Sequence, residues 1–349
     1  MQKFRTITIL FFVSILFLSV SCVNNTTAKK NMANNVPVEV KTKTQKLVEQ
    51  LFKNGDFISA ETSPKLMSTE EVYKSIGENI LVIDIRGAYD YSNGHIKNAV
   101  NIKKTEVIDF AQVKGLPLYD KVIMVCYTGQ SATYAAATLQ LLGYDNVYVL
   151  EWGMSGWNNK FSKHWKSGVS DMGVDKLTDS KYPKNASSTL PNIESKKNSG
   201  EEILYTRAKA IEKEGWRKNA VTYEFAEANA KKNYLISCQP ELVYEKGHMK
   251  NAILYSADNS FNLTTDLLTL PTDKTIMVYS NKGYQSSFIM VYLKMLGYDA
   301  KTVRYGANSF MNSKMTDFGD AFSSSLIKNY PYQTSEYIEE EGGAKEGGC

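Results

Sequence analysis

One stretch decides the fold: Lys121-Val-Ile-Met-Val-Cys-Tyr-Thr-Gly-Gln-Ser-Ala132. Its four consecutive apolar residues favour a strand buried on both faces, as in a parallel sheet covered by helices. A turn containing Gly129 follows, and residues 132–142 are rich in Ala and Leu and end at Gly143, which is typical of a helix and its C-cap. Because a strand, a turn and a helix follow one another, we expect an α/β fold with right-handed crossovers between parallel strands.

Cys126 stands at the carboxyl end of this strand, where open α/β sheets bind their ligands. The backbone N–H groups of the turn and the positive end of the next helix would face its sulfur and stabilise an anion. We therefore expect the Cys126 thiol to ionise below its reference pKa of about 8.5. Gly129 permits the backbone conformation that turns amides inward, and Ser131 can donate a hydroxyl or cap the helix. The alternative is an inert core cysteine, because free cysteines are often fully buried.

Sequence blocks around this stretch recur once further along the chain. The blocks at 81–86, 94–99 and 121–125 return 153 residues later, at 234–239, 247–252 and 274–278. After the helix, a Leu-Gly-Tyr-Asp block returns at an offset of 154. This near-constant offset predicts two domains of one fold, at 45–168 and 201–330, each a mainly parallel sheet flanked by helices. A linker rich in Ser, Asn and Lys, at 169–200, would join them.

The N-terminal residues predict export. A short basic start is followed by an apolar run at 6–20, and Ser21 and Cys22 come next. Since a membrane span needs about 20 apolar residues, residues 1–21 are typical of a signal peptide. Leu18-Ser-Val-Ser-Cys22 resembles a bacterial lipobox, which implies lipidation of Cys22. Plain secretion and a retained signal anchor are the alternatives.

Residues 22–44, rich in Asn, Thr and Lys, predict a flexible tether behind this anchor. We therefore expect a membrane-anchored lipoprotein of a bacterial cell envelope, on the periplasmic side or in the outer membrane. Val23 in place of Asp favours the outer membrane, because Asp after the lipidated cysteine is the usual cue for inner-membrane retention.

Charge and cysteine usage exclude several classes of function. The formal net charge is only +4, with basic and acidic residues intermixed, so we expect no nucleic-acid partner. Three widely separated histidines and four scattered cysteines match no metal or haem spacing. Cys238 takes the place of Ile85 inside a strand and is expected in the core. Cys349 ends an acidic, Gly-rich tail at 331–349, where it is either an incidental thiol or a mobile one that reacts with Cys126.

The motifs around Cys126 resemble the rhodanese family. Cys-x-x-Gly-x-Ser follows an apolar strand, with Asp-Ile-Arg at 84–86 and Gly-His-Ile-Lys-Asn-Ala at 94–99 before it and Glu151-Trp-Gly-Met-Ser-Gly-Trp157 after it. The resemblance covers nearly all of the first domain and, weakly, the second. It implies tandem rhodanese-like domains and a sulfurtransferase that needs no separate cofactor. Cys126 would take up sulfane sulfur as a covalent persulfide and pass it to a thiol or other nucleophile.

The resemblance also implies a set of site residues. Backbone amides would cradle the outer sulfur or the oxygens of the substrate. They belong to Tyr127, Thr128, Gly129, Gln130, Ser131 and Ala132. Asp84 and Arg86 match the family's Asp-x-Arg and are expected to form a mostly structural ion pair near the site. Because the side chains of the turn are neutral, a dianion such as thiosulfate would be held weakly, so persulfides or polysulfides are the expected donors and a thiol the acceptor.

The second copy lacks this chemistry. After Val278 the chain reads Tyr-Ser-Asn-Lys-Gly-Tyr-Gln-Ser286, which has no cysteine and is aligned as a loop one residue longer. Ser237 and Gln239 replace the Asp and Arg, so the second domain is expected to be an inert packing or docking partner. A His in the Gly-His turn persists in both copies, and we therefore expect His95 to be structural.

Aromatic residues and alternative functions complete the expectations. Trp152 and Trp157 are expected to pack rather than to stack on a substrate. Two other functions remain open. One is a non-catalytic rhodanese-like docking module of an envelope redox complex, and the other is a thiol redox protein that uses Cys126 and Cys349.

Overall fold

The computed structural model describes residues 41–55 and 63–337. The predicted signal peptide, Cys22, most of the predicted tether and Cys349 lie outside the described residues. Helix α1 (Lys43–Asn54) begins at a capping box on Thr42, so the folded body starts before the predicted boundary at residue 45. No helix in the described ranges has the length and apolarity that a bilayer span requires.

The first half of the chain builds a five-stranded sheet with the strand order β1-β5-β4-β2-β3. All of its strand pairs are parallel, as the sequence predicts. The strands are β1 (Leu66–Met67), β2 (Ile80–Asp84), β3 (Val100–Asn101), β4 (Lys121–Val125) and β5 (Val147–Leu150). Central β4 is the predicted strand before Cys126, and four of its five residues are buried because helices cover both faces of the sheet.

The helices of this half follow the predicted alternation with strands. They are α2 (Thr69–Lys74), α3 (Ala88–Ser92), α4 (Val107–Lys114), α5 (Gln130–Leu141), α6 (Gly153–Trp157) and α7 (Lys163–Gly168), with 3-10 turns at Leu116–Leu118, Asn159–Phe161 and Val174–Lys176. Helix α5 is the Ala- and Leu-rich helix predicted after the turn, and it begins two residues earlier than the pattern suggested. Its first residue therefore belongs to the Cys-x-x-Gly-x-Ser motif itself.

The second half repeats this architecture, which confirms two domains of one fold. Its sheet has the order β6-β10-β9-β7-β8, the same arrangement as the first sheet. The strands are β6 (Ala220–Val221), β7 (Tyr234–Ser237), β8 (Ile253–Leu254), β9 (Ile276–Tyr279) and β10 (Ala300–Val303). The helices are α8 (Gly200–Glu214), α9 (Trp216–Asn219), α10 (Tyr223–Asn229), α11 (Glu241–Glu245), α12 (Tyr284–Met295) and α13 (Asn308–Met315), with 3-10 turns at Leu267–Thr269, Thr316–Phe318 and Ser324–Leu326.

Backbone hydrogen bonds correct the predicted alignment of the two halves. The carbonyl of Cys126 accepts from Met154 N–H, and the carbonyl of Ser280 accepts from Ala307 N–H at the same place of the second half. In both halves four residues separate the central strand from the helix that follows. The second turn is therefore not longer than the first, and Ser280 occupies the position of Cys126. The extra residue lies between β8 and β9, since β3 and β8 still match at an offset of 153.

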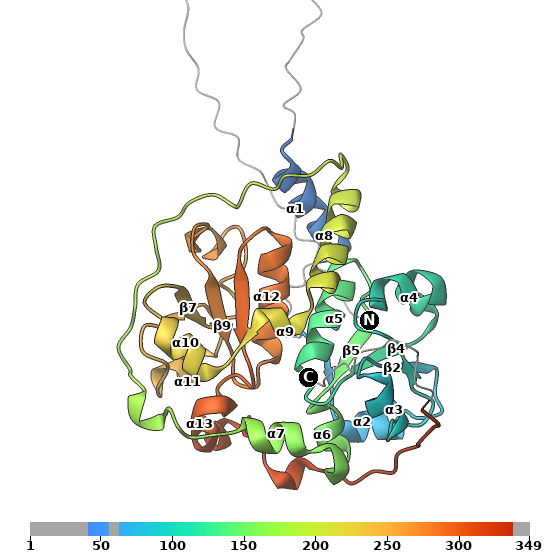
Figure 1. Cartoon of the computed structure of the whole chain (residues 1–349). Helices are drawn as coiled ribbons and strands as arrows, with labels where there is room; N and C mark the ends of the chain where they lie inside the picture. Colours follow the sequence, from blue (N-terminus) through green and yellow to red (C-terminus); the bar gives the residue numbers. More distant parts are fainter. Residues whose placement is uncertain (1–40, 56–62, 338–349) are drawn as a thin grey trace, which may run out of the picture. The chain divides into compact units, whose positions relative to one another are not determined.

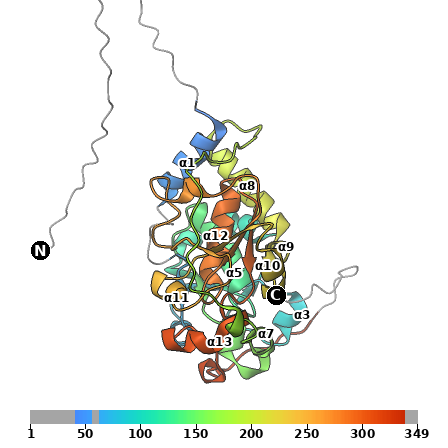
Figure 2. The ribbon, with the colours of Figure 1, turned by 90° about the vertical axis from the view of Figure 1, so that its left-hand side faces the viewer.

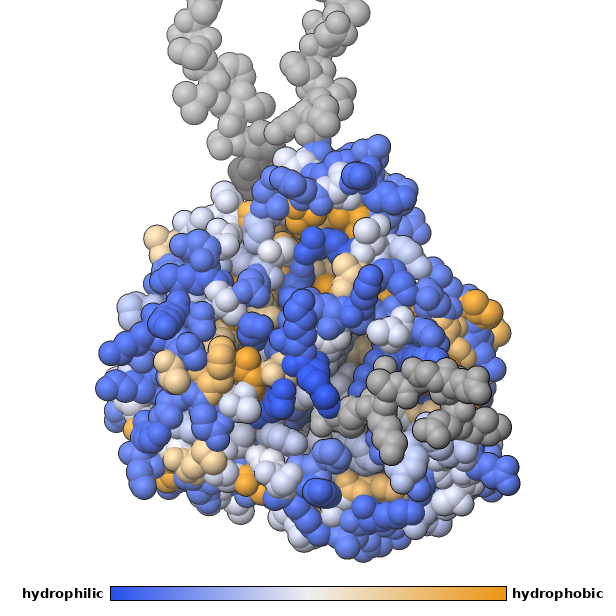
Figure 3. Space-filling model, viewed as in Figure 1, coloured by the Kyte–Doolittle hydropathy of each residue, from blue (hydrophilic) through white to orange (hydrophobic). Residues whose placement is uncertain are grey.

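The two halves share one hydrophobic core. Helix α12 packs against α5, and α8 packs against α1, α5 and α12, as both views of the ribbon show (Figure 1 and Figure 2). A single cluster of buried side chains contains Leu139 of α5 and Phe288 of α12. The face seen in Figure 3 is mostly hydrophilic, with its hydrophobic residues in separate small patches. Apolar burial thus runs along the α5–α12 contact and joins the two domains.

Each half is also strapped by a segment that follows the other half. The linker, yellow-green in Figure 1, pairs Thr178 with His248 of the second half in an antiparallel bridge. The segment after the second half pairs Gln333 with His95 of the first half in the same way. Backbone hydrogen bonds to the first half continue to Ser335, so the boundary of the predicted tail at residue 331 was set too early.

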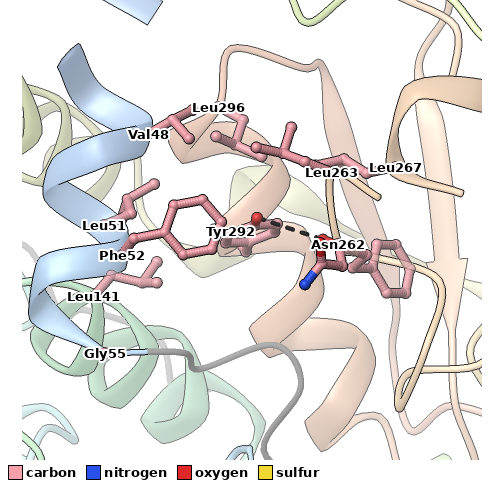
Figure 4. A pocket seen from close by; sticks show the side chains of 11 residues that line it. Val48, Leu51, Phe52, Gly55, Leu141, Asn262, Leu263, Leu267, Tyr292 and Leu296 are labelled. Carbon is pink, nitrogen blue, oxygen red and sulfur yellow. Dashed lines mark hydrogen bonds between the residues drawn. The ribbon is translucent and has the colours of Figure 1, made fainter. Parts of the chain in front are cut away.

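A shallow apolar pocket lies between α1 and the second half (Figure 4). Leu51 and Phe52 of α1 face Tyr292 of α12 across it. Leu141, the last residue of α5, also lines it, whereas the Cys126 turn lies at the first residue of that helix. A 12-residue helix is about 18 Å long, so this pocket is remote from the Cys126 turn.

Candidate active site

Cys126 directly follows β4, and its side chain has no exposed surface. Its Sγ accepts a hydrogen bond of 3.1 Å from the backbone N–H of Gly129. Gly129 has φ +86°, in the left-handed region, and in this conformation its amide points at Cys126 Sγ. Cys126 also belongs to the hydrophobic cluster that the two halves share. The site therefore combines the burial of a core cysteine with an amide donor aimed at its sulfur.

The side chains at positions 128, 131 and 132 of the predicted cradle are buried. The hydroxyl of Thr128 accepts the N–H of Gln130 at 3.4 Å, so that amide is engaged within the turn itself. Ser131 and Ala132 are buried in the first turn of α5. Ser131 also lines a small, mostly apolar cavity beside Ile85, which continues between α5 and the α8–α9 region.

Asp84 and Arg86 form a buried ion pair, as expected. Arg86 Nη2 lies 2.6 Å from Asp84 Oδ2, and the side chains are 0% and 1% exposed, respectively. The same nitrogen donates to the carbonyl of Gly94 at 2.7 Å. The guanidinium also packs over the rings of Tyr127 and Phe161, with centroid distances of 4.9 and 5.4 Å. Burial by itself lowers the pKa of Arg86, but the attraction of Asp84 raises it above the ordinary value, so Arg86 stays charged beneath Tyr127, the residue after Cys126.

Tyr127 also contacts a polar side chain, that of His164. Its ring lies 4.3 Å from the ring of His164, which the sequence did not single out because no motif contains it. Burial raises the pKa of Tyr127, and Asp90 raises it further. Burial lowers the pKa of His164, while Asp90 opposes that effect. Tyr127 of the Cys126 turn and His164 of α7 thus pack against each other.

The second half of the chain also contacts the Cys126 turn. Tyr284, the first residue of α12, is 2% exposed. Its hydroxyl donates to the Thr128 carbonyl at 3.1 Å and accepts the N–H of Trp152 at 2.7 Å. The sequence contained no signal for this contact, because its partners are 132 and 156 residues away along the chain.

The first half makes the reciprocal contact with the second. Gln130, the first residue of α5, donates through Nε2 to the Lys282 carbonyl at 3.3 Å and accepts the N–H of Tyr305 through Oε1 at 3.0 Å. Lys282 and Tyr305 stand where the first half has Thr128 and Trp152. One side chain of each half, Gln130 or Tyr284, thus hydrogen-bonds to a corresponding carbonyl and N–H of the other half. We call these reciprocal contacts the interlock.

Lys282 contributes a cation to this region, but its charge is paired. Its Nζ lies 2.8 Å from Glu151 Oε1 and 2.9 Å from Asp320 Oδ1. Burial lowers the pKa of Lys282, and the two carboxylates raise it above the ordinary value, so the lysine is held charged between them. Its charge is neutralised at the interface between the halves.

In the second half, neutral residues stand in the places of Cys126 and of the Asp84–Arg86 ion pair. Ser280 stands in the place of Cys126, and its hydroxyl accepts the N–H of Ser286 at 3.1 Å. Ser237 donates to Gln239 at 3.0 Å, where the first half has its ion pair. Cys238 is 1% exposed, and burial raises its pKa well above the ordinary value, which confirms it as a core residue. The second turn holds no thiol nucleophile.

Comparison with known proteins assigns both halves. Residues 68–160 and 221–313 each match the family model of the rhodanese-like domain. The chain belongs to the rhodanese family. Its first rhodanese domain contains the Cys126 turn, and its second contains the Ser280 turn.

Relatives of these rhodanese domains include enzymes. The chain is 33% identical over 97 residues to the thiosulfate sulfurtransferase GlpE of Pseudomonas entomophila, and the match covers 28% of this chain and 87% of that protein. It is 33% identical over 93 residues to the GlpE of Pseudomonas fluorescens, covering 27% and 84%. Among solved structures, a thiosulfate sulfurtransferase from Pseudomonas aeruginosa is 13% identical with a TM-score of 0.28, covering 84% of this chain and 50% of that one. At that score the structural likeness adds nothing to the family assignment.

The histidine of the Gly-His turn makes the same contacts in both rhodanese domains, which fits the structural role expected for His95. His95 Nδ1 lies 2.9 Å from the Tyr91 carbonyl, and His248 Nδ1 lies 2.8 Å from the Tyr244 carbonyl. Each imidazole also stacks on its tyrosine ring. Trp157 is fully buried and donates its indole N–H to the carbonyl of Pro331, in the segment that follows the second half, which confirms its packing role.

Proposed function

We propose that this protein is a sulfurtransferase whose first rhodanese domain carries sulfane sulfur as a persulfide on Cys126. The observation that carries the proposal is the hydrogen bond from Gly129 N–H to Cys126 Sγ at the carboxyl end of the central strand. An amide donor favours the thiolate over the thiol and would equally stabilise the terminal sulfur of a persulfide. The relatives named as thiosulfate sulfurtransferases support the same reaction class.

The reaction proceeds in two displacement steps. The Cys126 thiolate attacks the outer sulfur of a donor, the sulfur–sulfur bond of the donor breaks, and the donor leaves as a thiolate, or as sulfite if it was thiosulfate. Cys126 then bears the transferred sulfur as a persulfide anion. An acceptor thiolate attacks that terminal sulfur, which breaks the bond to Cys126 and restores its thiolate. Electrons and charge balance in each step, so no separate redox cofactor is needed.

Charges around the turn favour donors of low charge. Arg86 is buried and paired with Asp84, and Lys282 is paired with two carboxylates. Neither cation is therefore free to bind the two charges of thiosulfate. The cavity beside Ser131 is mostly apolar. A persulfide or polysulfide with an organic group at one end carries a single charge, so such a donor, with a thiol acceptor, fits these surroundings better than thiosulfate does.

Access to Cys126 requires motion. Its side chain is 0% exposed, and the Tyr284 ring of the second rhodanese domain lies against Gly129 of the same turn. A donor therefore reaches the sulfur only when the turn or the contact between the domains opens.

The decisive experiment measures thiocyanate release from the purified protein supplied with polysulfide or thiosulfate, with cyanide as the acceptor. We expect wild type to release thiocyanate faster than the protein-free mixture, with the larger gain from polysulfide, and Cys126→Ser to add nothing to the protein-free rate. Cys238→Ala is the matched control, because it removes a buried cysteine from a strand that carries no chemistry, and it should retain activity. A rate above the protein-free rate that survives in Cys126→Ser would refute the mechanism.

A second function has two observations in its favour. The complete burial of Cys126 and the interlock with the second domain suit a non-catalytic docking module of an envelope complex. That function predicts no thiocyanate from any donor and no mass increase of one sulfur on Cys126. The same experiment therefore separates the two functions.

We further propose that the protein acts in a bacterial cell envelope, anchored by a lipid on Cys22. The support is the sequence of residues 1–22 alone. Wild type should fractionate with membranes and label with a fatty acid, whereas Cys22→Ser should not label. Equal labelling of both proteins would contradict the anchor.

A further inference from the structure

The peptide between Thr128 and Gly129 is held at both of its ends. Its carbonyl oxygen accepts two hydrogen bonds, from Trp165 Nε1 at 3.0 Å and from the Tyr284 hydroxyl at 3.1 Å. Its N–H, on Gly129, donates to Cys126 Sγ at 3.1 Å. Because a trans peptide is planar, its carbonyl and its N–H point in opposite directions. Donors that fix the carbonyl therefore also fix the direction of the N–H.

Tyr284 can make only one arrangement of hydrogen bonds here. A backbone N–H can only donate, so the Tyr284 hydroxyl must act as acceptor toward Trp152 N–H, 2.7 Å away. Its single proton is then left for the Thr128 carbonyl. Burial raises the pKa of Tyr284 well above its ordinary value, and the nearby Cys126 raises it further, so the hydroxyl keeps that proton when Cys126 is ionised.

The turn is shaped to receive this ring. A Cβ at Gly129 would lie 2.8 Å from Tyr284 Cε1 and 3.2 Å from its hydroxyl oxygen. Only glycine leaves room for the ring to approach this closely. The absence of a side chain at Gly129 thus serves both its φ of +86° and its contact with the second domain.

We infer that Tyr284, supplied by the second rhodanese domain, is a positioning residue that aims the Gly129 N–H at Cys126 Sγ. The inference rests on the proposed sulfur transfer and assigns the second domain a part in it. This domain was expected to be inert, but the contact makes it a component of the anion cradle. In the reciprocal contact Gln130 holds a turn that has Ser280 in place of cysteine, so only Tyr284 acts on a reactive sulfur.

The test compares full-length Tyr284→Phe with wild type. Alkylation of the Cys126 thiol by iodoacetamide is followed by mass spectrometry of its peptide from pH 5 to pH 10. The variant keeps the ring but loses the hydroxyl, so we expect the midpoint of the pH profile to rise by about half to one pH unit. Raising the pH should restore the rate, which a merely structural defect would not do.

Two further variants sharpen the result. Tyr284→Gln supplies both an acceptor and a donor, as Gln130 does on the reciprocal side, and should keep the midpoint of wild type. Tyr244→Phe removes another buried hydroxyl of the second domain, one that donates to the Ala252 carbonyl at 2.8 Å, and should leave the profile unchanged. If Tyr284→Phe does not fold, the comparison of Tyr284→Gln with the apolar Tyr284→Met replaces it.

The outcomes separate this inference from the proposed function. A Tyr284→Phe profile that matches wild type, in a protein with unchanged circular dichroism, overturns the positioning role even if Cys126 forms a persulfide. A raised midpoint supports the positioning role whether or not a persulfide is found. Failure of wild type to form a persulfide from any donor would instead refute the proposed function.

Discussion

Gly129 and Gly283 offer a matched pair of substitutions, because they occupy the same position in the two turns. Their φ angles are +86° and +81°, and each is the N-cap residue directly before the helix that follows its turn. A Cβ at Gly129 would lie 2.8 Å from Tyr284 Cε1, and a Cβ at Gly283 would lie 2.9 Å from Gln130 Nε2. The two alanine variants should therefore cost similar stability, although only one of the turns contains a cysteine.

The expected magnitude follows from two contributions. A residue other than glycine in the left-handed region costs about 1–2 kcal/mol. The close contact made by the new Cβ adds about 1–3 kcal/mol, as overpacking of a core usually does. Gly129→Ala should therefore lower the free energy of unfolding by about 2–5 kcal/mol, and Gly283→Ala by a similar amount.

Function should separate the two variants. Gly129→Ala displaces the amide that donates to Cys126 Sγ, and loss of one such donor typically reduces the rate by about 100-fold or more. Urea unfolding gives the stability of each variant, and thiocyanate release is then measured at a temperature where both are folded. Equal loss of transfer in both variants, at equal loss of stability, would show that the Gly129 amide has no special role.

The remaining predictions concern the ion pair behind the turn and the histidine in front of it. Asp84→Asn leaves the buried charge of Arg86 without its partner, so urea unfolding should show a loss of about 3–5 kcal/mol. Glu70→Gln breaks the exposed pair with Lys74 and should cost nothing measurable; a similar loss in both variants would contradict the structural role of Asp84. Because burial lowers the pKa of His164 below its unfolded value of about 6.5, the folded state is favoured above that pH and loses stability as the pH falls through this window. Thermal melts of His164→Gln should therefore decline less than those of wild type between pH 7.5 and pH 5, and parallel declines would exclude this contribution.

Much of the fold was predictable because its signals are local. The apolar run before Cys126, the glycine of the turn and the Ala- and Leu-rich helix lie next to one another in sequence, and they form β4, the turn and α5 as predicted. The repeat at 153 residues predicted a second sheet, which has the same strand order as the first. The core position of Cys238 was also predictable, since it follows from its place in a strand pattern. The buried Asp84–Arg86 pair was expected because Asp-Ile-Arg resembles the rhodanese motif.

The sequence by itself thus determined two α/β domains, a cysteine at the end of a central strand and a glycine beside it, because hydrophobic period and turn chemistry are encoded over a few residues. The tertiary structure decided that Ser280 takes the place of Cys126, because backbone hydrogen bonds set the strand register, whereas the sequence repeat shows only which residue types recur. It also decided that Tyr284 lies on the Cys126 turn and that the segment after the second domain straps the first. Such contacts join residues more than 100 positions apart in the chain, so they form only when the two domains fold and pack together.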